Sequence, residues 1–180
     1  MRWKGRLLAL IGFIAIVGLI VGAGYFLLGF FNVGASQKDP DVVAWALVRT
    51  RTASIDRHAT ERPPGPLDDP AMVRAGARAY AERGCVNCHG APGVGWGKWS
   101  EGLNPDPPDL KEIVKDLEPR HLFWVVKNGI RMTGMPNFGY LDDKEIWTIV
   151  AFVGKIATVS PDEFKAWSAA TPGATPGETR

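Results

Sequence analysis

The sequence is poor in cysteine and has no basic domain, and both shortages narrow the possible functions. Only two cysteines occur among the 180 residues, which excludes a disulfide framework. Residues 1–67 carry 8 Lys and Arg against 4 Asp and Glu, a charge of +4, and residues 68–180 carry 13 against 15, a charge of −2. Because neither part is strongly basic, nucleic acid is not expected as a partner. The length also excludes a large multidomain enzyme.

Alternating strand patterns of useful length and internal repeats are missing as well, so an all-α chain is expected. Within residues 68–159, capping residues predict four short helices, which begin after Asp69, Asp109, Glu118 and Asp142. Glu145 stands three residues after Asp142, the spacing of a capping box. Four short helices with long loops bury little apolar surface, which indicates that a large apolar cofactor completes the core.

One long hydrophobic run does occur, over residues 7–31, and it contains no charge. About 20 apolar residues cross the hydrocarbon core of a bilayer, so the run predicts a transmembrane helix. Three basic residues precede it, and the next one is Lys38. The positive-inside rule therefore predicts a cytoplasmic N-terminus and places everything after residue 31 outside. A cleaved signal peptide ending near Val33-Gly34-Ala35 is the alternative, but its apolar region would be shorter. Both interpretations export the remaining chain.

The sequence divides into residues 1–35 as an anchor, 36–67 as a linker, 68–159 as a compact domain and 160–180 as a flexible tail containing one possible short helix. In the linker, residues 41–59 predict a helix with Asp39 as N-cap and Pro40 in its first turn. Trp45 and the linker arginines could lie at the membrane interface. A spacer helix surrounded by solvent, without contact to the membrane, is an equally supported alternative.

The motif that carries chemistry is Cys85-Val86-Asn87-Cys88-His89, because C-x-x-C-H is the attachment signature of haem c. Two cysteines three apart project from one helical turn and can both reach neighbouring vinyl groups. His89 then lies under the iron as its proximal ligand. A thioredoxin-like dithiol would need a βαβ context, and a structural zinc site would need four ligands. One covalently bound haem c is therefore predicted.

The sixth iron ligand is predicted to be Met135, which lies in an irregular Gly-Met-Pro loop well downstream. Met132 stands three residues away and remains an alternative, although a packing role is the ordinary one for such a methionine. His121, in the first turn of a helix, is expected to be exposed. An open sixth position is the remaining possibility, and the less favoured donors are Met72 and His58.

Together these features resemble a class I c-type cytochrome of the bacterial monohaem type, over residues 68–159. Gly76 and Tyr80 are similar to the family's glycine and aromatic that cross the last helix, where Trp147 or Phe152 would face them. The resemblance implies the all-α cytochrome c fold, with four to five short helices around a covalently bound haem, here preceded by one transmembrane helix.

The resemblance also implies roles for further residues. Pro108 would accept the ring N–H of the proximal histidine through its carbonyl, Leu110 would line the haem pocket, and the Thr133 hydroxyl would bond a propionate. Phe138 resembles an aromatic that follows the axial methionine. The loop over residues 90–108 resembles the family only weakly. Its two tryptophans, Trp96 and Trp99, would pack on the haem edge or bond propionates.

Filled axial positions leave one-electron transfer as the available chemistry. We therefore expect an electron carrier, or the cytochrome subunit of a larger oxidoreductase, in the inner membrane with its haem domain in the periplasm. Its partners would be membrane redox complexes or dehydrogenases of a respiratory chain, besides the lipid bilayer. Lys98, Lys127 and Arg131 could form a docking patch beside a haem edge that opens near the two cysteines. A peroxidase-like enzyme and a redox or gas sensor with a labile sixth ligand are the alternatives.

Overall fold

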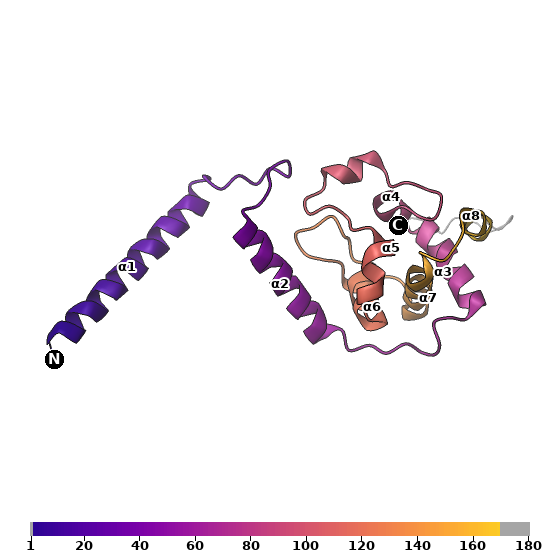
Figure 1. Cartoon of the computed structure of the whole chain (residues 1–180), viewed down its shortest axis with the longest axis horizontal. Helices are drawn as coiled ribbons and strands as arrows, with labels where there is room; N and C mark the ends of the chain where they lie inside the picture. The colour runs from indigo at the N-terminus through magenta and orange to yellow at the C-terminus, as the bar shows by residue number, and fades with distance from the viewer. Residues whose placement is uncertain (1, 170–180) are drawn as a thin grey trace. The chain divides into compact units, whose positions relative to one another are not determined.

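Residues 2–169 are described by the structure, which is a computed structural model. The chain divides into two compact units, residues 1–37 and a second that begins at residue 38 (Figure 1). Within the described residues the regular elements are all helices, joined by loops, and no strand forms apart from an isolated bridge between Ala91 and Val94. The predicted all-α class is confirmed.

The first unit consists mainly of α1 (Arg2–Leu27). Its segment Trp3–Leu27 contains an 18-residue stretch with a mean hydropathy of 2.7 and is long and apolar enough to cross a membrane. The helix ends four residues before the apolar run does. Gly29 follows with a φ of +78°, a left-handed conformation that only glycine adopts readily and that cannot continue a helix.

The second unit begins with α2 (Asp41–His58), within the predicted linker. The expected cap at Asp39 is wrong by one residue: Pro40 is the N-cap, with an extended ψ of 139°, and no side chain caps the helix. The far end of α2 packs on α6 (Pro119–Asn128), where Arg120 Nη1 donates to the Ala59 carbonyl at 3.0 Å. Part of the predicted linker therefore belongs to the compact unit.

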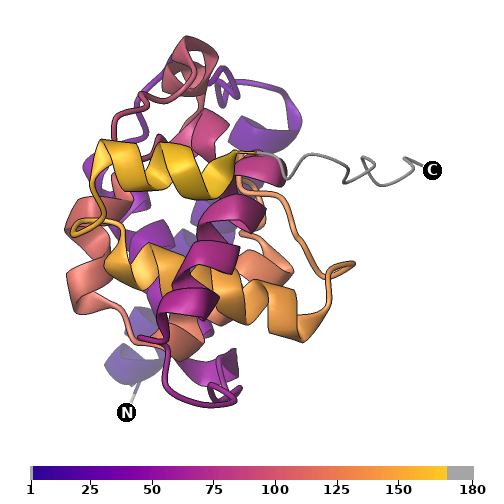
Figure 2. The same cartoon turned by 90° about the vertical axis from the view of Figure 1, so that its right-hand side faces the viewer.

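The core is centred on the crossing of α3 (Pro70–Glu82) and α7 (Asp143–Lys155). Figure 2 shows the α3 ribbon passing across α7 and across α8 (Pro161–Ser168). Tyr80 and Phe152 are fully buried at this crossing, with ring centroids 5.2 Å apart. Of the two aromatics proposed to face Tyr80, Phe152 does so, whereas Trp147 stacks on Phe123 at 4.2 Å.

Short elements complete the domain: α4 (Val86–His89), η1 (Lys98–Gly102), α5 (Leu110–Ile113) and η2 (Val114–Asp116). The four predicted helix starts are confirmed, because α3, α5, α6 and α7 begin directly after Asp69, Asp109, Glu118 and Asp142. Asp69, Asp109 and Asp142 each accept a backbone N–H at the start of their helix, as expected. The capping box at α7 is wrong, because Glu145 instead binds Arg83 of α3 at 2.8 Å. The short helix expected in the tail is α8, and residues 170–180 lie outside the described residues.

Candidate functional site

The two cysteines lie on a single turn that follows directly from α3. Gly84 ends that helix with a φ of +76°, and the Cys85 N–H then donates to the Tyr80 carbonyl at 3.1 Å. Cys88 N–H bonds back to the Cys85 carbonyl at 3.2 Å, so both residues belong to one turn running into α4. Both thiols are free and partly buried. Burial raises the pKa of Cys85 to about 11 and also raises the pKa of Cys88, so the thiols are neutral at pH 7.

Gly90, the residue after His89, is held in place by a hydrogen bond from α3. The Tyr80 hydroxyl donates to the Gly90 carbonyl at 2.8 Å. Burial raises the pKa of Tyr80, so this hydroxyl keeps its proton and remains a donor. Gly90 has a φ of +64°, and a Cβ there would lie 3.0 Å from the Val94 carbonyl. The backbone thus turns sharply after His89, which separates the histidine from the loop that follows.

Nδ1 of the His89 imidazole lies 3.1 Å from the carbonyl oxygen of Pro108. A carbonyl only accepts, so Nδ1 carries the hydrogen and Nε2 keeps a free lone pair. Burial lowers the pKa of His89, opposed by the Pro108 hydrogen bond, so the neutral ring that a metal needs is favoured. Next to this carbonyl, Asp109 caps α5 and Leu110 is buried in the core. The structure therefore brings together the predicted trio of histidine, proline and leucine.

The loop that carries Met135 is shaped by its own hydrogen bonds. Thr133 Oγ1 donates to the Ile130 carbonyl at 2.8 Å and accepts from the Met135 N–H at 3.1 Å. The Ile130 N–H donates to the Met135 carbonyl at 3.2 Å. Thr133 was expected to bond a propionate, a role that stays a prediction. In this structure its hydroxyl orders the backbone on which Met135 stands.

Two contacts attach this loop to the rest of the domain. Gly129 has a φ of +67° and lies so close to residues 135–137 that a Cβ would be 2.8 Å from the Met135 carbonyl. A Cβ at Gly134 would be 2.6 Å from Cδ1 of Leu103, in the loop after the cysteines. Met135 is half-buried against the same hydrophobic core that Cys85 contacts and that includes Leu110. The motif and the methionine, about fifty residues apart, thus share one core.

The alternative sulfur and nitrogen donors are placed less favourably. Met132 is 90% exposed at a φ of +59°. Met72 packs on the core from α3, and the His58 ring nitrogen Nδ1 lies 2.8 Å from the Ser54 carbonyl on α2. The expected exposure of His121 is wrong: it is only 9% exposed, because α2 covers it and brings Asp56 within 3.4 Å of its Nε2.

Two of the loop and patch residues make contacts within the domain. Trp96 donates its indole N–H to Glu101 at 3.3 Å, and packing of Trp96 and Trp99 on the haem edge or bonding to propionates stays a prediction. Lys127 lies 2.7 Å from Asp143 and above the Phe123 ring, so its charge is compensated inside the domain. Lys127 is therefore not a free charge, and a docking patch of Lys98, Lys127 and Arg131 stays a prediction.

Two contacts in this region, one between backbone groups and one made by a side chain, were not predicted. The Gly97 N–H donates to the Asn87 carbonyl at 2.7 Å, which joins the tryptophan loop to the turn between the two cysteines. Leu103 packs on Gly134, as described above. The glycines themselves were the available signal, because a glycine often marks a close approach of two backbone segments. The sequence alone does not say which segments meet.

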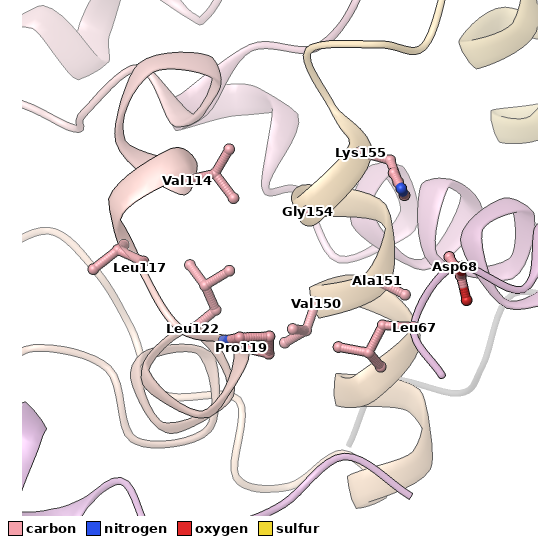
Figure 3. Close-up of a pocket in the computed structure, with 10 residues that line it drawn as sticks. All are labelled: Leu67, Asp68, Val114, Leu117, Pro119, Leu122, Val150, Ala151, Gly154 and Lys155. Carbon is pink, nitrogen blue, oxygen red and sulfur yellow. The ribbon is translucent and has the colours of Figure 1, made fainter. Parts of the chain in front are cut away.

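A pocket of about 330 Å³ lies away from these residues. It opens between the segment from α5 to α6 and the last turns of α7 (Figure 3). The side chains that line it are mainly apolar, with Asp68 and Lys155 also contributing, and the predicted haem residues are not among them. It is a surface hollow between packed helices and is not the predicted cofactor site.

The donor set described above fits a haem. Two thiols on one turn, a histidine oriented through Nδ1 and a half-buried methionine on a shaped loop are the groups a haem c site requires. No group of three or more His, Cys, Asp and Glu that could hold a bare metal ion occurs among the described residues.

Comparison with known proteins agrees with this geometry. Residues 71–153 match the family model described as cytochrome c oxidase, cbb3-type, subunit III. No curated protein and no solved structure matches the chain significantly. The matched range runs from α3 to α7 and includes the cysteine motif, the Pro108 loop and Met135. Residues 71–153 therefore form a c-type cytochrome domain that binds haem c, and a helix long and apolar enough to cross a membrane precedes this domain.

Proposed function

We propose that this protein transfers single electrons through one haem c, bonded covalently to Cys85 and Cys88, with His89 and Met135 as axial ligands. The observation that carries the proposal is the hydrogen bond between His89 Nδ1 and the Pro108 carbonyl, at 3.1 Å. This bond directs the Nε2 lone pair away from Pro108 and keeps one tautomer. It also makes the ring a stronger ligand. When bound, the haem supplies the change of its iron between two oxidation states.

The chain's own residues hold this site in one geometry. The Tyr80 hydroxyl and the Gly97 N–H fix the turn that carries the cysteines, each through one backbone carbonyl. Thr133 fixes the backbone of Met135. With His89 and Met135 both bound to the haem iron, oxygen or peroxide would find no free position there, and electron transfer would be the reaction that remains.

The position of His121 argues against the peroxidase-like alternative. Such an enzyme needs an acid or base near an open iron position, and His121 was the nearest candidate in the sequence. In the structure its Nε2 is buried, has no hydrogen-bond partner among the described residues and faces Asp56 of α2. It therefore serves the packing of α2 on α6.

We further propose that the protein works at the inner membrane, with its N-terminus in the cytoplasm and its haem domain in the periplasm. The basic residues before the apolar run support this orientation. The family description supports a role as the cytochrome subunit of a membrane oxidase complex. Tethering keeps the haem near partners in the same membrane, which raises their effective concentration.

The test uses the full chain purified from membranes in detergent. We expect the intact mass to increase by one haem that survives denaturation, and the oxidised form to show the weak long-wavelength band of iron–methionine ligation. A high-spin ferric spectrum would contradict electron transfer as the main role, and a colourless protein would contradict the whole proposal. Co-purification with other redox subunits separates the two modes of action: a subunit retains them, whereas an independent carrier does not.

A further inference from the structure

The first two turns of α2 leave a cluster of large apolar side chains exposed. Val42, Trp45, Leu47 and Val48 are between 47% and 70% exposed, and no residue of α2 is buried. Asp41 is the one charged residue among the first eight of this helix. We call these four residues the apolar end of α2. An exposed apolar cluster of this kind marks a surface that contacts another molecule or a membrane.

The opposite end of α2 is held by the cytochrome domain. Ala59 is fully buried, and its carbonyl accepts from Arg120 Nη1 at 3.0 Å. Asp56 lies 3.4 Å from Nε2 of His121, and the ring of His58 is 6.2 Å from that of Trp124. The helix is therefore fastened to α6 through its last turn, and its first turns do not take part in these contacts.

We propose that the apolar end of α2 contacts lipid at the membrane interface. This inference rests on the anchoring of α1 in the bilayer. Only residues 28–40 separate the two helices. Thirteen residues span at most about 45 Å when fully extended. The bilayer is therefore always within reach of this surface and at high effective concentration, unlike any soluble partner.

The side chains suit the boundary between headgroups and acyl chains. Tryptophan is enriched at this boundary because its ring is apolar and its N–H is polar. Arg49 and Arg51 follow directly, and their long stems can lie along apolar surface while the guanidinium groups reach phosphates. The apolar residues gather at one end of α2 and not along one side. Only the first two turns of α2 therefore enter the membrane interface, and the helix does not lie along the membrane surface over its whole length.

Lipid contact at its N-terminal end and packing on α6 at its C-terminal end would let α2 orient the haem domain. Because its last turn is fixed on α6, an N-terminal end held in lipid restricts how the haem domain can turn above the membrane. A domain with a restricted orientation presents the same face repeatedly to partners in that membrane. The expected consequence is less orientational search for each encounter.

The experiment is lipid photocrosslinking of the haem-loaded full chain in vesicles of phosphatidylethanolamine and phosphatidylglycerol. A benzophenone amino acid replaces Trp45 in one variant and Tyr140 in the matched control, since these side chains are 65% and 71% exposed. An unchanged haem spectrum in both variants verifies the fold. We expect lipid adducts, identified by mass, to be severalfold more abundant at position 45 than at position 140.

Four results would overturn the inference. Equal lipid labelling at both positions would show that α2 has no particular contact with the bilayer. A crosslink from position 45 to a second copy of the chain would assign the surface to self-association. Failure of the chain to float with the vesicles would contradict both the membrane anchoring of α1 and this inference. Flotation without lipid adducts at position 45 would contradict the inference alone. In every case the haem spectrum reports separately on the proposed function.

Discussion

Gly76 of α3 lies directly against the backbone of Thr148 on α7, so that a Cβ at position 76 would overlap the Thr148 carbonyl oxygen. The same Cβ would be 2.9 Å from the Cβ of Phe152. Only a residue without a side chain lets the two helices approach this closely. This contact holds together the framework from which the cysteine turn projects.

Gly76→Ala is expected to destabilise the haem-loaded protein by at least about 2 kcal/mol, because a backbone carbonyl cannot move aside as a side chain can. The control is Gly154→Ala on α7, where a Cβ meets nothing within 4 Å. There, alanine should be neutral or stabilising by up to about 1 kcal/mol. Denaturant unfolding measures both variants, and equal effects would contradict the role of the crossing.

Met135→Ala should leave the covalent haem in place, remove the long-wavelength band and lower the reduction potential, because methionine ligation raises that potential. Met132→Ala is the control, since its side chain is 90% exposed and is expected to contribute nothing to the spectrum. Absorption spectra and a redox titration give the result. If the Met132 variant changed and the Met135 variant did not, the axial ligand would have to be reassigned.

Asp56→Ala should loosen the last turns of α2 by removing the carboxylate that faces His121. Because Asp56 is largely exposed, the loss in global stability should stay below about 1 kcal/mol. Amide hydrogen exchange of residues 49–58 should nevertheless become faster. Arg51→Ala, at an exposed position on the same helix, should leave that exchange unchanged. A similar acceleration in both variants would show that the effect does not depend on the contact between Asp56 and His121.

The capping box at α8 predicts a dependence of stability on pH. The backbone N–H and hydroxyl of Ser160 donate to the Glu163 carboxylate at 2.9 and 2.7 Å and lower its pKa. A lowered pKa means that the stabilisation is complete above the pKa of the unfolded chain and disappears as the pH falls through the folded value. The parent chain should therefore exceed Glu163→Gln in Tm above about pH 5. This advantage should shrink in more acidic solution. A constant difference from pH 3 to pH 7 would show that the carboxylate does not titrate in this way.

Local patterns were sufficient for the starts of α3, α5, α6 and α7 and for the residues of the cysteine motif. The Asp69, Asp109 and Asp142 caps depend on a side chain bonding an N–H two residues away, so the sequence identifies them. The pairing of Glu145 could not be found in this way. Its carboxylate could accept either from a backbone N–H in its own turn or from Arg83, which is 62 residues away in the sequence. Only the crossing of α3 and α7 made the second partner available.

The histidines show the same division. The sequence by itself determined that His89 follows a pair of cysteines, and that a proline carbonyl near position 108 could orient it, because chemistry and family resemblance both depend on residue type. Only the tertiary structure decided the environment of His121. Its burial depends on α2, and two segments about sixty residues apart meet through packing that leaves no signal in either one alone. The order of residues fixed which groups can act as ligands, whereas the docking of helices decided which of them are exposed.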